Sequence, residues 1–471
     1  LDFHIADLDV LNSGQIEKDQ LRVRDLEIST LVLPPARDWE PELLSWLDAF
    51  EQQGGTVIRT TDDPDRTLRD IAAHVQPSLP MNALEGDARR VLSVCRRDQN
   101  SRRWFLLNSA AESATLEFPS DLTLRELPLS DASPALLEQS SGGWRRTLAP
   151  FESILLEESQ TPDTQTPPPV VPMAIGGACT VLPLSPNLLR LNTWRMDLLD
   201  EKGETLESAE VEALPLANQL QAAGFRFAPQ FVGGGVNQPQ LRLPALRVRY
   251  IAEFAVECGT SAAALLMEPG SVKGDWTVQI NDGRLFHERD FKTSAAHVSG
   301  SREIDIAALL VPGINRITLH VAADELDHGL RNPLYIAGDF AVQFQPMRLT
   351  ARDASGMFET YESNGLPFFS GSVEYGFMID LTTTLPTGNI LLEPTFDSPC
   401  EEAIELSFNG KKWHAAPWSP RRVLVPATEL RQGANEVRVR VHTSLIRAFE
   451  GQRFNIAKHR YENVDSIPDH D

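Results

Sequence analysis

One pattern occurs twice in the second half of this chain and constrains its fold more than any other feature. In the first copy, residues 276–280 alternate between apolar and polar side chains and lead into an Asn-Asp-Gly sequence at 281–283. After a spacer, a Gly-Ile-Asn sequence at 313–315 opens a second alternating run at 316–321. Alternation places successive side chains on opposite faces of a strand, and Asn-Gly or Asp-Gly sequences favour the positive φ angles of type I′ hairpins.

The second copy repeats this order of elements. The alternating run 404–408 leads into Asn409-Gly410, and a Gly-Ala-Asn sequence at 433–435 precedes the run 437–441. We expect the three valines of the last run on the core face and its two arginines in solvent. Further alternating strands near residues 246 and 370 begin the two copies. The repeat therefore predicts two copies of one β-sandwich.

The first part of the chain has a different pattern. A buried strand at 26–33, a helix with an apolar stripe ending near Gly54, a strand at 56–58 and a helix at 65–74 form a βαβ unit. A right-handed crossover would make its strands parallel. Because two strands are too few for a parallel sheet covered on both faces, we expect further strands upstream of residue 1 or within 1–25. The start at Leu1 then marks the C-terminal part of a longer protein.

The fold class predicted is mainly β, with tandem jelly-roll sandwiches preceded by a small β-sandwich and a partial, amidotransferase-like α/β domain. Short strands at 91–95, 104–107, 115–118 and 154–156 indicate the small sandwich. The expected ranges are the partial α/β domain at 1–85, the small sandwich at 86–159, a Pro-rich linker at 160–172, an irregular segment at 173–245, jelly-roll sandwich 1 at 246–345 and jelly-roll sandwich 2 at 346–471.

The charge balance excludes some partners. With 43 Lys+Arg and 66 Asp+Glu, the formal net charge is −23, which argues against binding to nucleic acid or to an anionic membrane surface. No apolar run approaches the length that spans a bilayer. The four cysteines are far apart and form neither a disulfide framework nor a CxxC pair, so we interpret them as free thiols.

The repeat also carries a family resemblance. The segments 278–283 and 311–321 resemble the sugar-binding jelly-roll domain of glycoside hydrolase family 2, and 407–410 with 430–441 resemble a second such domain. Together with 329–340 and 366–375, they are similar to the C-terminal region of large α-L-rhamnosidase-type glycoside hydrolases (family 106). In that group, an amidotransferase-like domain and a small sandwich can precede the jelly rolls.

The resemblance implies a catalytic (β/α)8 barrel with paired carboxylates, upstream of this region. Such a barrel needs about 250 residues of alternating strand and helix, and no part of this chain has that pattern. We therefore assign no catalytic residue and leave open whether the chain is itself an enzyme. The resemblance implies carbohydrate and the upstream barrel as partners, and it favours the periplasm or the cell exterior.

Sugar binding requires exposed aromatic rings beside polar groups. Near the Asn409-Gly410 turn lie Trp413, His414 and Trp418, and Trp276 flanks the corresponding turn of the first copy. We propose these four as carbohydrate-binding candidates, with packing in the sandwich core as the alternative. The Phe368-Phe369 pair is interpreted as structural.

Other clusters give weaker indications. Asp324, Asp327 and His328 could help to hold a structural calcium ion, which binds oxygen ligands. Neither this cluster nor 287–290 has the HExxH spacing of a zinc hydrolase, and no GxSxG sequence indicates an esterase.

We therefore predict the accessory C-terminal portion of a large glycoside hydrolase acting on plant or microbial polysaccharide. The alternative is a free-standing carbohydrate-binding or adhesion protein. A third hypothesis is a complete glycosidase with an unfamiliar site in the sandwiches.

Overall fold

The computed structural model describes most of the chain, which forms two compact units, residues 1–167 and 168–471. The described residues are 6–24, 26–35, 39–75, 79–97, 101–127, 129, 136–159, 168–225, 242–257, 263–344, 347–358, 361–382, 384–396, 402–455, 458 and 460–464.

The predicted βαβ unit is present in the first unit. Strands β4 (Thr30–Leu33) and β5 (Thr56–Arg59) pair in parallel, and α2 (Pro41–Gln52) connects them. Phe50 of α2 is fully buried, and Gly54 follows the helix at φ +97°. The parallel pairing confirms the prediction from the crossover rule.

The remaining elements of this α/β domain include a small antiparallel sheet at residues 15–28. The single strand predicted at 26–33 is divided into two at Ser29. Residues 26–28 pair with this small sheet, and residues 30–33 pair with β5. The elements are α1 (Leu8–Ser13), β1 (Gln15–Glu17), β2 (Gln20–Val23), β3 (Leu26–Ile28) and α3 (Pro64–His74).

The small sandwich has two antiparallel four-stranded sheets that enclose Trp104, Phe118 and Leu156. All four predicted strands are present within longer ones. One sheet has the order β10 (Leu124–Leu127), β13 (Ser153–Glu158), β8 (Arg102–Asn108), β7 (Val91–Arg97); the other has β11 (Glu138–Ser140), β12 (Gly143–Leu148), β9 (Ala114–Pro119), β6 (Asn82–Glu85).

The second unit contains the two predicted large sandwiches. Sandwich 1 packs a five-stranded sheet against a larger one around Trp194, Tyr250 and Tyr335. The first sheet is β16 (Asn187–Leu191), β28 (Leu334–Gly338), β20 (Ala263–Met267), β25 (Arg302–Asp305), β24 (Lys292–Thr293). The second is β18 (Thr205–Glu212), β17 (Thr193–Leu199), β19 (Arg242–Val256), β26 (Gly313–Glu325), β22 (Asp275–Ile280), β23 (Leu285–His287), with β29 (Ala341–Gln343) and β30 (Arg348–Thr350) beside β19.

Short elements close the ends of sandwich 1. They are α4 (Leu216–Ala222), whose Leu216 and Leu220 are buried, and the pair β21 (Val272–Lys273) and β27 (Gly329–Leu330).

Sandwich 2 packs a three-stranded sheet against a six-stranded one around Phe369, Tyr375 and Phe408. The first sheet is β14 (Val170–Ile175), β33 (Asn389–Phe396), β36 (Val423–Pro426). The second is β31 (Ser355–Met357), β15 (Ala178–Pro183), β32 (Ser372–Leu381), β37 (Gly433–His442), β34 (Ala403–Phe408), β35 (Trp413–Ala416). The predicted fold class, mainly β with tandem sandwiches, is thus confirmed.

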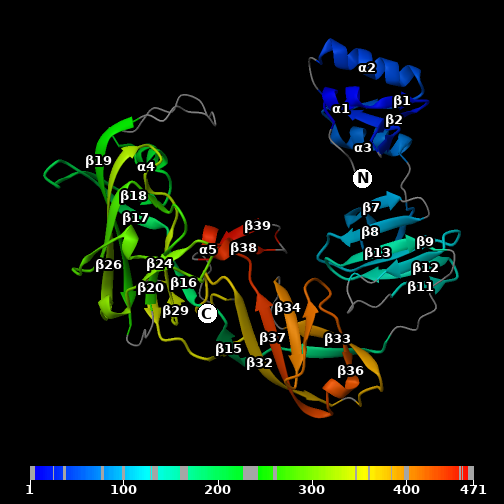
Figure 1. The fold of residues 1–471 in the computed structure, drawn as a ribbon. Coiled ribbons are helices and arrows are strands. Elements are labelled where there is room, and N and C mark those ends of the chain that lie inside the picture. Colours follow the sequence, from blue (N-terminus) through cyan, green and yellow to red (C-terminus); the bar gives the residue numbers. More distant parts are fainter. Residues whose placement is uncertain are drawn as a thin grey trace. The chain divides into compact units, whose positions relative to one another are not determined.

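Sandwich 1 is an insertion within sandwich 2. Strand β14 pairs in parallel with β33, and β15 pairs with β31 and β32 (Figure 1), so sandwich 2 begins before sandwich 1 and resumes after it. The domain ranges expected from the sequence differ from the observed ones in this region. Residues 170–172 of the expected linker belong to β14, and the expected irregular segment 173–245 contains β15–β18 and α4. Pairing partners more than 170 residues away are invisible to a local pattern.

The repeated asparagine turns share one arrangement. Asn281 and Asn409 both have φ +51°, and the glycines Gly313 and Gly433 have φ +98° and +89°. The connection that contains each asparagine is longer than the two-residue hairpin expected. The last paired residues are Gln279 and Leu285 in the first copy and Ser407 and Trp413 in the second. Each of these asparagines instead donates a side-chain hydrogen bond to the asparagine of the Gly-x-Asn turn, Asn281 to Asn315 and Asn409 to Asn435.

The C-terminal segment, residues 446–464, contains α5 (Ile446–Glu450) and the hairpin of β38 (Gln452–Asn455) and β39 (Arg460–Asn463). Ala448 and Val464 join the core of sandwich 1, although the segment follows sandwich 2 in the chain. Among the described helices, none has the length and apolar composition needed to cross a membrane.

Candidate functional site

Trp413 and His414, two of the predicted sugar-binding residues, point to opposite faces of β35. The Arg440 guanidinium carbon lies 4.0 Å from the Trp413 ring centroid, so a cation already covers one face of this ring. His414 is 7% exposed, and its Nε2 lies 2.8 Å from Oε2 of Glu429. We therefore interpret His414 as a core residue whose imidazole bonds to Glu429.

The other two candidates lie in different sandwiches. Trp418 follows β35 and is 43% exposed. Trp276 of β22 is 6% exposed, packs edge-on against Phe291 at 5.7 Å, and borders a hollow of about 300 Å³ that includes His287. The structure therefore places Trp413 at the start of β35 and Trp418 beyond the other end of that strand, both in sandwich 2, and leaves Trp276 in sandwich 1.

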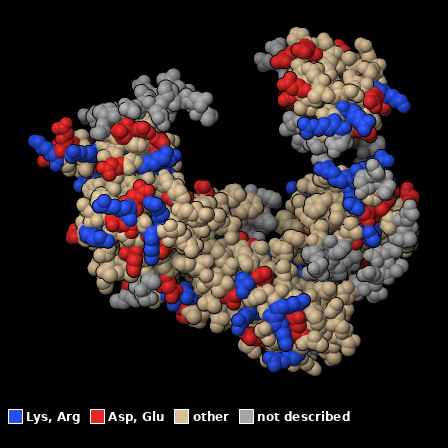
Figure 2. Space-filling model, in the orientation of Figure 1, with Lys and Arg blue, Asp and Glu red and all other residues tan. Residues whose placement is uncertain are grey.

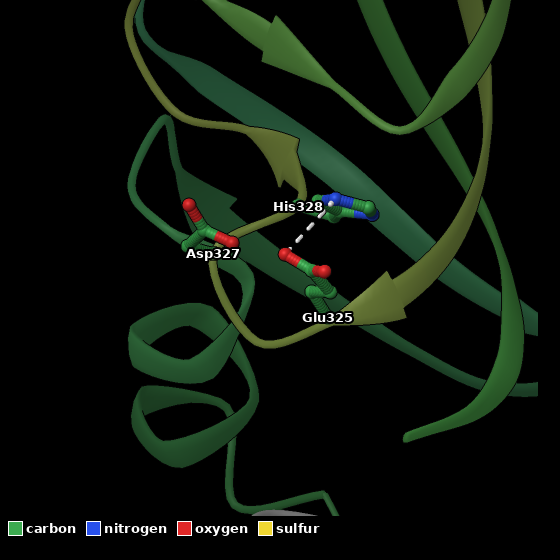
Figure 3. A group of neighbouring side chains, drawn as sticks. All are labelled: Glu325, Asp327 and His328. Atoms are coloured by element: carbon green, nitrogen blue, oxygen red, sulfur yellow. Dashed lines mark ion pairs between the residues drawn. The ribbon is translucent and has the colours of Figure 1, made fainter. Parts of the chain in front are cut away.

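The expected calcium site has a different composition in the structure. Glu325, Asp327 and His328 have ligand atoms within 4.8 Å of one another (Figure 3). Asp324 is instead an ion-pair partner of His328, with 3.1 Å between its Oδ1 and the imidazole Nδ1.

This group of donors does not fit calcium, which takes six to eight oxygen ligands. Lys273 Nζ lies 2.8 Å from Asp327 Oδ2 and lowers the pKa of that carboxyl through a hydrogen bond. His328 Nε2 lies 3.6 Å from Glu325 Oε2. The ammonium of Lys273 therefore already pairs with Asp327, and an imidazole lies beside Glu325, so we assign the cluster a structural role.

A further cluster escaped the sequence analysis. Ser372 Oγ lies 2.8 Å from Nδ1 of His442, and Nε2 of His442 lies 3.2 Å from Glu405 Oε2. Arg440 also contacts Glu405, at 3.1 Å, and Glu374, at 2.7 Å. These residues form a row of side chains across β32, β37 and β34, which cross-strand pairing explains.

A pocket with convergent polar groups lies where sandwich 1 meets the C-terminal segment. Its volume is about 400 Å³, within the range of small-molecule sites. Several segments far apart in the chain line it. The lining residues are Arg190, Leu191, Asn192, Thr193, Glu212, Ala252, Glu253, Phe344, Met347, Phe368, Glu450, Gly451, Gln452 and Asn463.

One wall of the pocket is aromatic. The rings of Phe344 and Phe368 meet edge to face, with centroids 5.7 Å apart and planes at 89°. Phe368 is 5% exposed and belongs to the core of sandwich 1, in agreement with the structural role predicted for it from the sequence. Phe344 is half-buried. Phe344 therefore offers an apolar ring surface beside the polar lining.

Another part of the lining comes from the C-terminal hairpin. Gln452 and Asn463 are directly paired across β38 and β39, and Gln452 Nε2 donates to Asn463 Oδ1 at 3.0 Å. Behind them, hydrogen bonds from Lys458 and Asn455, and then from Arg460, lower the pKa of Glu462 to about 2. This network of charges and amides fixes the hairpin that carries both pocket residues.

Helix α5 is held against sandwich 1 by polar contacts. Arg190 donates to the Phe449 carbonyl from Nε at 3.0 Å and from Nη2 at 2.8 Å. The hydroxyl of Tyr335 lies 2.8 Å from Glu268 Oε1 and 3.3 Å from the Ala448 carbonyl. Burial, together with Glu268, raises the pKa of Tyr335. These contacts set the position of the pocket wall that begins at Glu450.

Comparison with known proteins finds distant likenesses among solved structures alone. No family model and no curated protein matches the sequence. Among solved structures, the chain is similar to a rhamnosidase from Novosphingobium sp. PP1Y, with 16% identity and a TM-score of 0.25 over 70% of this chain and 35% of that one. A β-D-mannosidase from Dictyoglomus thermophilum has 11% identity and a TM-score of 0.23, over 54% of this chain and 31% of that one.

A β-glucuronidase from Faecalibacterium prausnitzii has 12% identity and a TM-score of 0.22, over 51% of this chain and 40% of that one. The chain thus spans well under half the length of these three structures. The sheets and the pocket described above define the class of the protein, which is mainly β with tandem sandwiches and a polar pocket. The resemblance to α-L-rhamnosidase-type hydrolases remains a prediction.

Proposed function

We propose that this chain is a carbohydrate-binding accessory region of a large glycoside hydrolase of the α-L-rhamnosidase type. The observation that carries the proposal is the pocket between sandwich 1 and the C-terminal segment. An aromatic ring covers the apolar C–H face of a sugar, while amides and carboxylates bond its hydroxyl groups. Phe344, Gln452 and Asn463 supply these two kinds of surface in one cavity of suitable volume.

The tandem sandwiches would support a catalytic barrel and shape the entrance for its polysaccharide substrate. This role follows from the resemblance of the two asparagine turns to sugar-binding jelly rolls. On sandwich 2 we propose the exposed ring of Trp418 and, separately, the half-buried ring of Trp413 as further sugar contacts.

The alternative is a free-standing carbohydrate-binding or adhesion protein, which would use the same pocket. Hydrolysis assays with aryl-rhamnosides and other aryl-glycosides address the third hypothesis, a complete glycosidase. Turnover of any of these substrates by this chain would contradict both non-catalytic functions.

The direct test is saturation-transfer difference NMR with a panel of monosaccharides that includes L-rhamnose, D-mannose, D-galactose and D-glucose. We expect a signal from at least one sugar, and we expect Phe344→Ala to reduce it strongly, leaving only the contribution of the sandwich 2 contact. Phe105→Ala is the matched control, because it removes an exposed aromatic ring of the small sandwich, to which no sugar contact is assigned. Absence of any signal across the panel, or equal signals from Phe344→Ala and the original chain, would overturn the pocket as the binding site.

A further inference from the structure

We infer that the pocket selects neutral sugars over uronates, an inference that rests on the proposed function. Carboxylates outnumber cations among the lining residues: Glu212, Glu253 and Glu450 stand against Arg190 alone. The charge of the lining therefore differs from that of a site built for an acidic sugar, where arginine forks bind the carboxylate.

The single cation of the pocket is already engaged. Both Nε and Nη2 of Arg190 donate to the carbonyl oxygen of Phe449, at 3.0 and 2.8 Å. This geometry uses the side of the guanidinium that would otherwise form a two-point contact with a sugar carboxylate. Arg190 therefore acts as an anchor for α5.

The carboxylates differ in how far their charge is compensated. Glu253 pairs with Arg316, whose Nη2 lies 2.8 Å from its Oε1. Glu212 and Glu450 are exposed and have no ion-pair partner among the residues that the structure describes. They come from different walls, Glu212 at the end of β18 and Glu450 at the end of α5.

These two carboxylates favour a polyol and oppose an anion. A sugar hydroxyl can donate to a carboxylate oxygen in a charge-assisted bond. A sugar carboxylate in the same place would meet two like charges, which at a partly solvated site weakens binding by about tenfold. The amides of Asn192, Gln452 and Asn463 have both donors and acceptors and so match hydroxyl groups of either sugar. The discrimination therefore comes from charge.

Figure 2 gives the wider context, since acidic and basic side chains are interspersed on the face in view. The net charge of −23 adds a general repulsion of anions, which salt screens over about 10 Å. The local and the general effect are separable, because only the local one depends on Glu212 and Glu450.

The test compares sugars that differ only at C6, D-galactose with D-galacturonate and D-glucose with D-glucuronate. Dissociation constants are measured by NMR titration with the whole chain at low and at physiological salt. We expect the neutral member of a bound pair to bind about tenfold more tightly. In the double variant Glu212→Gln, Glu450→Gln, the difference should shrink to less than about threefold, whereas Glu436→Gln on sandwich 2 should leave it unchanged.

The outcomes separate the two proposals. Equal or tighter binding of the uronate would overturn the charge selection and leave the sugar pocket in place. An unchanged preference in the double variant, with its thermal unfolding unaltered, would likewise overturn it. If neither member of any pair binds, and L-rhamnose and D-mannose fail as well, the proposed function itself is overturned.

Discussion

The side-chain amide of Asn409 donates a hydrogen bond to Oδ1 of Asn435 at 2.9 Å, joining the two turns of the second repeat. Asn435 Nδ2 in turn donates to the carbonyl oxygens of Arg431 and Gly433, both at 2.8 Å. In sandwich 1, Asn281 donates to Asn315 at 3.0 Å. The repeat seen in the sequence is therefore a repeat of one hydrogen-bonded corner.

Replacing Asn435 with aspartate should unfold sandwich 2 more easily. Asn435 is fully buried, and the change removes two N–H donors and places a carboxylate against two carbonyl oxygens. We expect a loss of about 2–4 kcal/mol in the free energy of unfolding, measured in urea. Asn389→Asp, at an exposed position of β33, is the control and should cost less than about 0.5 kcal/mol. Equal effects of the two variants would contradict the role of the corner.

The turns and strands of this corner were predictable from the sequence because their signals are local, whereas the hydrogen bond between the two asparagines was not. Asn-Gly, Gly-x-Asn and strict alternation each occur within a few residues, and Val437, Val439 and Val441 are buried as expected. The partners of β14 and β15 were not predictable, since nothing within 170–183 indicates strands beyond residue 350.

Removing the buried arginine of the small sandwich should destabilise that domain strongly. The Arg146 side chain is 3% exposed, with Nε 3.0 Å from Glu126 Oε2 and Nη2 2.7 Å from Glu152 Oε1. Arg146→Met leaves two buried carboxylates without their cation, which costs about 3–5 kcal/mol. The neighbouring Arg145→Met is the control, because Arg145 is exposed. The unfolding temperatures of both variants measure this loss. Equal decreases in the two variants would contradict the stabilising role of Arg146 between Glu126 and Glu152.

The C-terminal hairpin should lose stability at acid pH. Hydrogen bonds from Lys458, Asn455 and Arg460 lower the pKa of Glu462 to about 2, below its usual value of about 4.3. A lowered folded-state pKa contributes stability above about pH 4.3 that is lost as the pH falls towards 2. NMR titration of the Glu462 carboxyl carbon should show a midpoint near 2 that rises in Lys458→Met. A midpoint above 4 in the unaltered chain would contradict this expectation.

Cys179 should alkylate slowly at neutral pH. Burial raises the pKa of its thiol to about 11, so only about 0.1% is thiolate at pH 8. Peptide mass spectrometry after iodoacetamide treatment should show labelling of Cys179 that rises about tenfold per pH unit up to pH 10. The half-buried Cys95 serves as the internal reference. A rate independent of pH over this range would be inconsistent with a buried thiol.

The pocket could not have been found from sequence, for reasons that its residues make clear. Arg190, Phe344 and Gln452 come together only because sandwich 1 is inserted into sandwich 2 and the C-terminal segment returns to it. The tryptophans near the asparagine turns were the visible aromatic signals. Of these, Trp276 is almost wholly a core residue, because a large ring on the inner face of a strand is buried by the opposite sheet.

Gly451 connects the fold of the C-terminal segment to binding in the pocket. It ends α5 at φ +64°, where an added Cβ would lie 3.2 Å from Arg190 Nη1 and 3.5 Å from Phe368 Cε1. Gly451→Ala therefore carries two costs, about 1 kcal/mol of backbone strain and a displacement of the arginine that anchors α5. We expect a lower unfolding temperature and a several-fold weaker affinity for the neutral sugar, measured by NMR titration.

Gly388→Ala separates these two effects. Gly388 has φ +91°, and an added Cβ would meet no atom within 4 Å, so only the backbone strain remains. This control should lower the unfolding temperature by a similar amount and leave the sugar affinity unchanged. If both variants weaken binding equally, the effect of Gly451 is general destabilisation. If neither does, the position of the C-terminal segment does not govern the pocket.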